Sequence, residues 1–581
     1  MIPYFGPGQK SLSSAPGLKR LLAALLLAGP GLALHAADTR GSRVVDLDTS
    51  RDFPPIASRV DWERRAAEIR GQVAVSCGLW PKPEKTALAA HVSGKIERDG
   101  YSVEKVYFQT FPGFYLAGNL YRPLGHGPGP FPGVLNPHGH WSDGRLADNK
   151  DGSIAARCIQ FARMGLVAFS YDMVGYNDTI QEPDHHAFAL DATNQLWSVS
   201  LMGLQAWNSI RSLDFLESLP DVDKDRLACT GESGGGTQTF ILGALEDRLK
   251  TQAPVVMVSH LMQGGCLCEN APGLRVRYSN MEIAASAAPR PQILVSATGD
   301  WTRDTMKVEG PSIANIYVLL GAPDHMKYLQ FNFGHNYNQT SREAVYSWFQ
   351  QWLIDGREGE TVAEKPYQKE ENSRLRVWPD GKLPEDALPA TELVPALVAR
   401  GQQALDAFRP SDAARLRAFH EMEFGAWKHT LQVEIPEGGL RVEAEEAGTG
   451  AGWRRTNLKI GRAGAGDEVP AVLFTAASGA KDRFVVLAHA QGRAAYLNEK
   501  GGPIGLADQL LSRNISVLIF DAFATGPGPD AAALRAHNPY TNFFTTYNRT
   551  LMQERVQDLV TVCAFARGLG QGAQSVCLWR G

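Results

Sequence analysis

The chain has 581 residues, of which 44% are hydrophobic, and a formal net charge of −4 from 58 basic and 62 acidic residues. This length predicts more than one domain, and the near-balanced charge excludes a strong attraction to nucleic acid or anionic lipid. Seven cysteines are too few for a fold built on disulfides. The composition is typical of a globular protein.

The N-terminus has the layout of a secretory signal peptide. Lys10, Lys19 and Arg20 precede an apolar run over residues 21–34, and small residues follow at Ala36 and Ala37. The run is short for a membrane-spanning helix. We expect residues 1–36 to be removed, no stable membrane span to remain, and the mature protein to be periplasmic or secreted. An uncleaved anchor is the alternative.

From about residue 102 to residue 353, short apolar runs alternate with longer amphipathic stretches. Residues 103–110 and 115–121 predict an antiparallel strand pair that turns at Gly113. Further strands are predicted at 131–135, 165–171, 226–230, 253–258 and 292–296, with helices at 154–164, 196–219, 237–246 and 341–354. Apolar strands that alternate with helices indicate a mostly parallel sheet covered on both faces.

The pattern then stops and starts again. The segment 356–389 is charged and contains prolines, as in a linker, and helices are predicted at 391–408 and 411–424. Later strands are predicted at 484–488, 517–521 and 575–579, with helices at 506–511 and 550–567. We therefore predict a catalytic domain at 60–370, a linker with helices at 371–430, and an incomplete second copy of the fold at 431–581.

The strongest motif is Thr-Gly-Glu-Ser-Gly-Gly-Gly at residues 230–236. A predicted strand precedes its G-x-S-x-G and a predicted helix follows, as in the nucleophile turn of α/β-hydrolases. Gly231 and Gly235 are small enough for this tight turn, which would expose Ser233 above the sheet. We expect the amide of Gly234, at the start of the helix, to stabilise a developing oxyanion. The alternative is a glycine-rich turn with an idle serine.

In this fold the acid and the base follow the nucleophile in the chain. Asp300 lies just after the predicted strand 292–296, with Asp304 as its rival, and His335 lies in the loop before the closing helix. We expect Ser233 to attack a carbonyl carbon, His335 to take its proton and Asp300 to orient His335. The alternatives are a loop cap or surface ion pair for the aspartates and a structural role for His335.

A second oxyanion donor is expected in the loop Asn-Pro-His-Gly-His-Trp at residues 136–141. The backbone amide of Gly139 or His140 would serve, and His138 would brace the loop by hydrogen bonding. Three segments at 171–178, 185–188 and 263–268 are expected at the carboxyl ends of strands, as pocket walls or as ordinary loop packing.

No metal and no cofactor are predicted. A metal site made by His138, His140, His185 and His186 would lack an obvious carboxylate partner. Cys266 and Cys268 have a CxC spacing that is not usual for zinc. We expect them to be buried thiols, or one of them to form a disulfide with Cys229 or Cys158.

With these residues, the chain resembles the bacterial secreted α/β-hydrolases of the acetylxylan-esterase-like family over about residues 102–352. The motifs that carry the resemblance lie at residues 136–140, 230–237, 264–270, 296–301 and 334–338. The resemblance implies carboxylic ester hydrolysis, with Ser233, Asp300 and His335 in the matching positions. Acetyl-xylan and cephalosporin deacetylases usually have Gln after the serine, where this chain has Gly234, so the substrate is less closely implied than the chemistry.

The sequence therefore predicts an α/β-hydrolase followed by a partial second α/β-hydrolase-like unit. It predicts a serine esterase that acts on small acyl esters, with carbohydrate as the alcohol and no nucleic-acid partner. The alternatives are a peptidase of the prolyl-oligopeptidase type, disfavoured because no propeller-like strand repeat precedes the catalytic domain, and a non-catalytic binding protein. Gly581 aligns with Gly231, so we expect the second unit to lack a nucleophile and to dock on the first or be part of a truncated chain.

Overall fold

The computed structural model describes residues 38–40, 44–181, 184–189, 191–436, 439–477, 484–526, 543–569 and 575–580, the last range by its backbone. The predicted signal peptide lies outside these residues. The chain forms two compact units. The catalytic unit comprises residues 46–426 with 545–547, and the second unit comprises the remainder. Within the described ranges, none of the helices combines the length and apolarity required to cross a bilayer.

A nine-stranded sheet forms the centre of the catalytic unit, with the order β1-β2-β3-β5-β4-β6-β7-β8-β9. The strands are β1 (His91–Arg98), β2 (Tyr101–Phe111), β3 (Phe114–Pro123), β4 (Phe131–Leu135), β5 (Val167–Tyr171), β6 (Val222–Glu232), β7 (Leu249–Val255), β8 (Gln292–Ala297) and β9 (Met326–Phe331). Strands β1, β2 and β3 pair antiparallel, β3 pairs antiparallel with β5, and the pairs from β5 to β9 are parallel. The predicted α/β-hydrolase fold with a mostly parallel sheet is confirmed.

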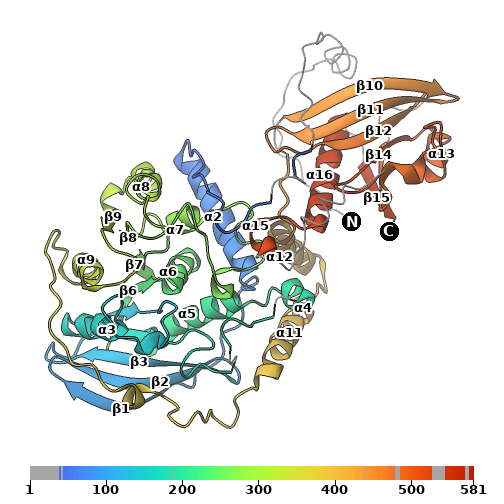
Figure 1. Ribbon diagram of the computed structural model, residues 1–581. Helices are drawn as coiled ribbons and strands as arrows, with labels where there is room; N and C mark the ends of the chain where they lie inside the picture. Colours follow the sequence, from blue (N-terminus) through green and yellow to red (C-terminus); the bar gives the residue numbers. More distant parts are fainter. Residues whose placement is uncertain are drawn as a thin grey trace. The chain divides into compact units, whose positions relative to one another are not determined.

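Helices cover both faces of this sheet (Figure 1). One face carries α3 (Ile154–Arg163) and α9 (Gln339–Phe349), and the other carries α5 (Leu201–Ser218), α6 (Gly234–Leu245), α7 (Asn280–Ala285) and α8 (Glu309–Leu319), with α2 (Arg59–Ser76) against α6. Neighbouring strand residues point to opposite faces, so Val134 belongs to one core and Leu135 to the other. Both are fully buried, which explains the continuous apolar runs in the sequence.

The structure differs from the predicted elements at three places, and at the first two the cause is local. The predicted helix 196–219 is interrupted: α4 (Ala192–Leu196) ends, and α5 begins after Ser200, whose hydroxyl accepts a hydrogen bond from the Gly203 amide at 3.0 Å. Strand β1 was not predicted, because its side chains are largely exposed and show no apolar alternation. The closing helix is α9, followed by a π-helical turn at Gln350–Asp355.

The second unit contains a six-stranded sheet of order β10-β11-β12-β14-β13-β15. Its strands are β10 (Leu440–Gly450), β11 (Trp453–Arg462), β12 (Val469–Ala476), β13 (Phe484–His489), β14 (Ser516–Phe520) and β15 (Ser575–Arg580), with helices α13 (Leu506–Leu511) and α16 (Leu551–Leu569). Strands β13 to β15 pair in parallel, and β12 pairs antiparallel with β14. This is the order and polarity of the first six strands of the catalytic sheet.

The segment after the catalytic sheet runs along the catalytic unit. It contains the helices α10 (Asn372–Leu375), α11 (Ala390–Ala407) and α12 (Ala413–Leu431). A further short helix, α15 (Phe544–Tyr547), comes much later in the chain. The amides of Val377 and Trp378 donate to the Asp178 carboxylate, and the Tyr115 hydroxyl donates to Asp386 at 2.6 Å.

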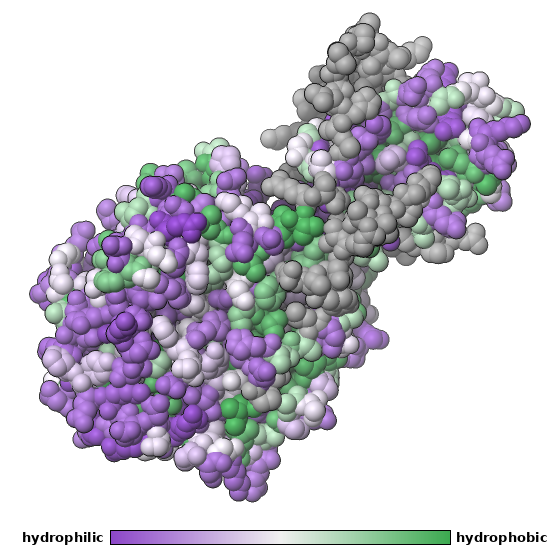
Figure 2. Space-filling model, in the orientation of Figure 1, coloured by the Kyte–Doolittle hydropathy of each residue, from purple (hydrophilic) through white to green (hydrophobic). Residues whose placement is uncertain are grey.

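The face of the catalytic unit seen in Figure 2 is mostly hydrophilic.

Candidate active site

The serine of the G-x-S-x-G motif lies in a strained turn between β6 and α6. Ser233 has φ 56° and ψ −123°, a region that non-glycine residues rarely adopt. A Cβ atom on Gly231 or on Gly235 would lie 2.4 Å from the carbonyl oxygen of Pro137. The two glycines are therefore required because the turn packs directly against the loop after β4. Ser233 is partly exposed, at the start of a helix whose first amides lack intrahelical partners.

Asp300 and His335 are brought together by the loops after β8 and β9. The Nδ1 atom of His335 lies 2.8 Å from Asp300 Oδ2. The other oxygen of Asp300 accepts hydrogen bonds from the amide and hydroxyl of Thr302, at 2.7 and 2.6 Å. The Asp300 side chain is 2% exposed and that of His335 is 31% exposed. This arrangement leaves Nε2 as the nitrogen of His335 that is able to take up a proton.

The rival carboxylate contacts a different histidine. Asp304 Oδ2 lies 3.4 Å from His260 Nε2, and its side chain is 32% exposed. Among the described residues, no hydrogen bond joins the Ser233 hydroxyl to His335. Catalytic hydrogen bonds are often long without substrate and tighten in the complex.

A buried ion pair fixes the loop after β4 to the nucleophile turn. The Glu232 carboxylate accepts hydrogen bonds from the Gly139 amide at 3.0 Å, the Trp141 indole, and Arg157 at 2.6 Å. Glu232 and Arg157 are each 1% exposed. Burial opposes ionisation of Glu232, but the Arg157 charge and these hydrogen bonds outweigh it and hold the pKa of Glu232 below its usual value.

The two amides predicted as the second oxyanion donor differ in their availability. The Gly139 amide is used by Glu232, whereas the His140 amide has no acceptor among the described residues. His138 braces this loop as predicted: its Nε2 accepts from the Met173 amide at 3.0 Å, and its Nδ1 lies 2.6 Å from the Gly139 carbonyl oxygen. Burial lowers the pKa of His138 to about 3, so the ring is neutral.

The loop after β5 is held by a second buried charge cluster. Arg145 donates to Asp172 and, at 2.5 Å, to Asp178. All three side chains are almost fully buried. Buried charges persist only when they are paired and hydrogen-bonded. This cluster gives the loop 171–178, which was predicted either as a pocket wall or as ordinary loop packing, a defined position beside His138.

The cysteine pair after β7 has an unpredicted neighbourhood. Cys266 and Cys268 are free, buried thiols, which confirms the first of the two predicted alternatives; Cys158 and Cys229 are also free, so the alternative disulfide to either of them is not formed. Instead, Cys266 and Cys268 lie beside His140 and His185. His138 is not part of this cluster, and His186 lies at its edge, with its Nδ1 3.8 Å from Cys266 Sγ. The sequence signal was weak, because the four residues come from segments up to 128 positions apart.

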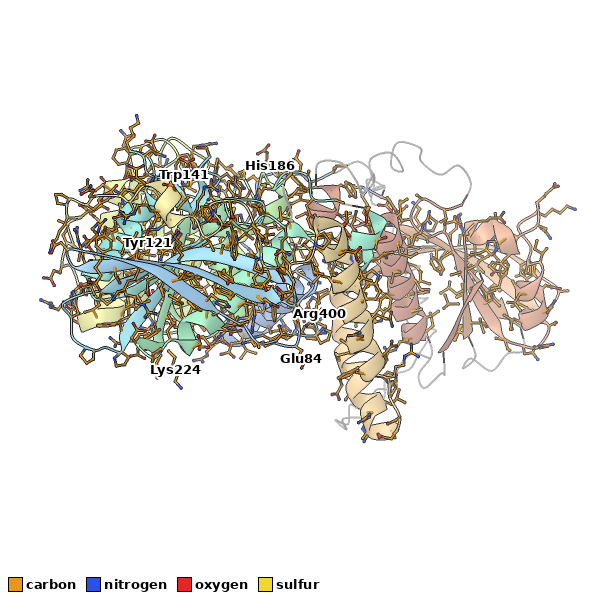
Figure 3. All side chains as sticks on the ribbon, turned by 90° about the horizontal axis from the view of Figure 1, so that it is seen from below. Glu84, Tyr121, Trp141, His186, Lys224 and Arg400 are labelled. Atoms are coloured by element: carbon orange, nitrogen blue, oxygen red, sulfur yellow. The ribbon has the colours of Figure 1, made fainter. Side chains whose placement is uncertain are left out.

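These segments meet at one edge of the catalytic unit. Trp141 and His186 are seen at the edge opposite Glu84 and Lys224 (Figure 3). Trp141 follows β4 and His186 follows β5, so this edge is formed by the carboxyl ends of parallel strands, where ligands bind in α/β proteins. Ser233, Asp300 and His335 follow β6, β8 and β9 in the same direction.

Known proteins are similar in sequence to part of this chain. Residues 96–261 match the family model described as acetyl xylan esterase (AXE1). The protein YtaP of Bacillus subtilis (strain 168), named as a hydrolase, is 25% identical over 243 residues, which is 39% of this chain and 80% of that protein.

Solved structures are also similar. Methylesterase BT1017 is 29% identical, with 60% of this chain and 78% of that chain covered and a TM-score of 0.47. A glucuronoyl esterase from Solibacter usitatus is 14% identical, with 53% and 97% covered and a TM-score of 0.40. The fold itself is evident from the strand order and the turn at Ser233.

Proposed function

We propose that the catalytic unit, which matches the acetyl xylan esterase family model over residues 96–261, cleaves small acyl esters of carbohydrates through Ser233, His335 and Asp300. The observation that carries the proposal is the hydrogen bond between His335 and Asp300, on the same sheet edge as a strained serine turn. Serine, histidine and a buried carboxylate in this chain order are the components of covalent acyl transfer.

The proposed reaction uses these residues as follows. The Ser233 hydroxyl oxygen attacks the ester carbonyl carbon while Nε2 of His335 accepts its proton. His335 then returns the proton to the departing alcohol, and a water molecule hydrolyses the acyl-enzyme by the same route. Asp300 keeps the proton of neutral His335 on Nδ1 and stabilises the imidazolium. The amides of Gly234 and His140 stabilise the oxyanion, because the Gly139 amide already donates to Glu232.

The choice of Asp300 over Asp304 is supported by contacts. Asp300 is buried, bonded to His335 and held by Thr302, so it can orient an imidazole. Asp304 is more exposed and lies beside His260. An acid that orients a catalytic histidine must itself be fixed, since its effect depends on geometry.

The substrate class and the cellular location belong to the same proposal. The family match supports an acyl ester, and acetyl esters of carbohydrates fit the family description. The N-terminal basic and apolar pattern supports export to the periplasm or beyond. We also propose that the second unit is a non-catalytic hydrolase-like repeat, supported by its strand order.

A fluorophosphonate probe and an ester panel test the function. The probe is expected to label Ser233 once, and Ser233→Ala is expected to abolish labelling and hydrolysis of p-nitrophenyl acetate and acetylated xylan. Ser212→Ala is the matched control, because Ser212 is buried within α5 and its hydroxyl donates to the Asn208 carbonyl of the same helix. Full activity in Ser233→Ala would refute the nucleophile. Binding of acetylated xylan without turnover would indicate a binding protein, and cleavage of peptide anilides would indicate a peptidase.

A further inference from the structure

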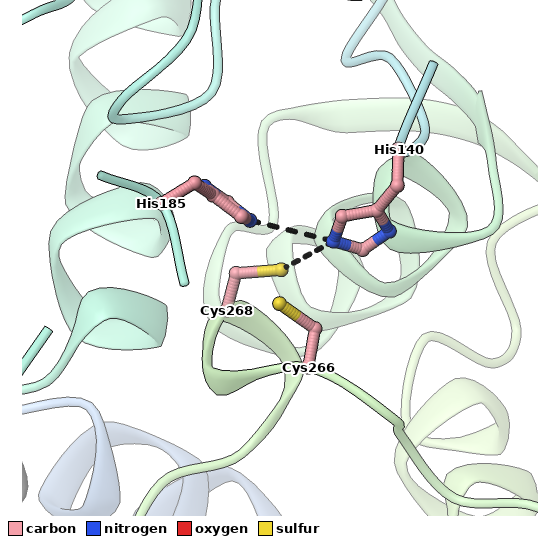
Figure 4. Close-up of side chains that lie close together, drawn as sticks. All are labelled: His140, His185, Cys266 and Cys268. Atoms are coloured by element: carbon pink, nitrogen blue, oxygen red, sulfur yellow. Dashed lines mark hydrogen bonds between the residues drawn. The ribbon is translucent and has the colours of Figure 1, made fainter. Parts of the chain in front are cut away.

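Four side chains with metal-binding atoms converge beside the proposed catalytic site. His140 comes from the loop after β4, His185 from the connection after β5, and Cys266 and Cys268 from the loop after β7 (Figure 4). One donor atom from each lies within 4.8 Å of all the others. His185, Cys266 and Cys268 are buried, and His140 is partly buried.

The spacing of the donor atoms suits a tetrahedral ion. Zinc bonds of about 2.0–2.1 Å to nitrogen and about 2.3 Å to sulfur imply ligand-to-ligand distances of about 3.3–3.8 Å. The Nε2 atoms of His140 and His185 are 3.3 Å apart, and His140 Nε2 is 3.2 Å from Cys268 Sγ. The widest separation, which lies within 4.8 Å, would contract by up to about 1 Å around an ion.

The histidine from the β5 connection is oriented as a ligand. Nδ1 of His185 lies 2.6 Å from the Val174 carbonyl oxygen. That oxygen can only accept, so Nδ1 carries the proton and the lone pair is on Nε2, which points at the cluster. Metal-binding histidines usually donate their second nitrogen to such a carbonyl or carboxylate.

The loop that carries Cys266 and Cys268 is also fixed by hydrogen bonds. The Glu269 carboxylate accepts from the amides of Gly265 and Cys266 at 2.9 and 3.0 Å, and the Asn270 side chain donates to the Cys266 carbonyl at 2.8 Å.

Space for His140 is provided at the nucleophile turn, since a Cβ atom on Gly234 would lie 2.7 Å from His140 Cε1. The imidazole therefore occupies the place where a larger residue after the serine would lie.

We propose that His140, His185, Cys266 and Cys268 bind one zinc ion. Two thiolates and two imidazoles in tetrahedral geometry are a donor set that zinc prefers. Four protein ligands leave no open position for water or substrate, so the site is structural. Each thiol loses its proton to solvent when the ion binds. The ion would link the loops after β4, β5 and β7.

The zinc site would act on catalysis through position. His140 is both a ligand by its ring and, in the proposed function on which this consequence rests, an oxyanion donor by its amide. Loss of the ion would release the His140 ring, while Glu232 still holds the Gly139 amide and the Trp141 indole on either side of it. We therefore expect a partial displacement of the donor amide. Loss of one oxyanion donor lowers kcat by about 10²–10³-fold, which sets the upper limit of the expected effect.

Metal content of the full chain tests the site without any use of activity. The wild-type chain and Ser233→Ala are purified without chelators, and metals are measured by mass spectrometry. We expect one zinc per chain in both, and none in Cys266→Ser/Cys268→Ser. Cys229→Ser is the matched control: Cys229 is equally buried, is outside the cluster, and should leave zinc at one per chain.

Cobalt provides a readout that needs no cysteine variant to fold. The wild-type chain, stripped of metal with a chelator and titrated with Co²⁺, should develop thiolate charge-transfer bands and the visible bands of tetrahedral cobalt at one equivalent. Absence of bound zinc together with absence of these bands in the reduced, folded chain would overturn the proposal, as would a native Cys266–Cys268 disulfide. If Ser233→Ala binds zinc but wild type has no esterase activity, the metal site stands and the proposed function fails.

Discussion

Substitution of Glu232 by Gln tests the physical link between the nucleophile turn and the loop after β4. The change keeps the shape of the side chain and removes its charge. Glu232 lies next to Ser233 in the chain, and its carboxylate bonds Arg157, Trp141 and the Gly139 amide. The amide oxygen of Gln can still accept from Gly139, so the main loss is the partner charge of Arg157.

The magnitude follows from burial. Arg157 and Glu232 are each 1% exposed, and removing one partner of such a pair costs about 3–5 kcal/mol because the other charge stays buried and unpaired. We expect the free energy of unfolding of the catalytic unit to fall by about this amount. We expect kcat to fall about 10- to 100-fold, since small displacements of catalytic groups have effects of this size.

Urea unfolding and steady-state hydrolysis measure the two effects separately. Glu97→Gln is the control, because the Lys95–Glu97 pair is exposed and such pairs contribute about 0–1 kcal/mol. Arg157→Met combined with Glu232→Gln should cost clearly less than the sum of the two single variants, since the unpaired charge is gone. A cost below about 1 kcal/mol for Glu232→Gln, or additivity in the double variant, would refute the reasoning.

Three further predictions concern the same unit. Asp300→Asn should lower kcat by about four orders of magnitude, whereas Asp304→Asn should change kcat by less than about tenfold; equal losses would mean that the His335–Asp300 bond is not used. Activity should be highest for acetyl esters and fall with acyl length, and a steady rise beyond hexanoyl would indicate an apolar lipase-like pocket. Because the pKa of Glu232 is lowered in the folded state, its stabilisation should be fully present above the ordinary carboxyl pKa of about 4.3 and be lost as pH falls through the lower folded value. Unfolding midpoints against pH should therefore decline less steeply in Glu232→Gln than in wild type, and parallel curves would contradict this.

The sequence by itself determined the fold class and the places where chemistry could lie. Buried parallel strands are apolar on both faces, so they can be recognised in the sequence as continuous apolar runs. The G-x-S-x-G motif between a predicted strand and a predicted helix around Ser233 is characteristic of a nucleophile turn. The repeated pattern after residue 433 likewise predicted strands that the structure has at β13 and β14. Elements with exposed or irregular patterns, such as β1 and α8, gave no comparable local signal.

Only the tertiary structure decided which distant residues share a contact. In the folded chain His335 contacts Asp300, and His260 contacts Asp304. The Gly139 amide donates a hydrogen bond to Glu232. His140 and His185 lie beside the two cysteines. These choices depend on how the loops at the carboxyl ends of the strands fold over one another. Long-range packing and buried charge pairs determine the conformation of these loops, and neither produces a periodic pattern in the amino-acid sequence.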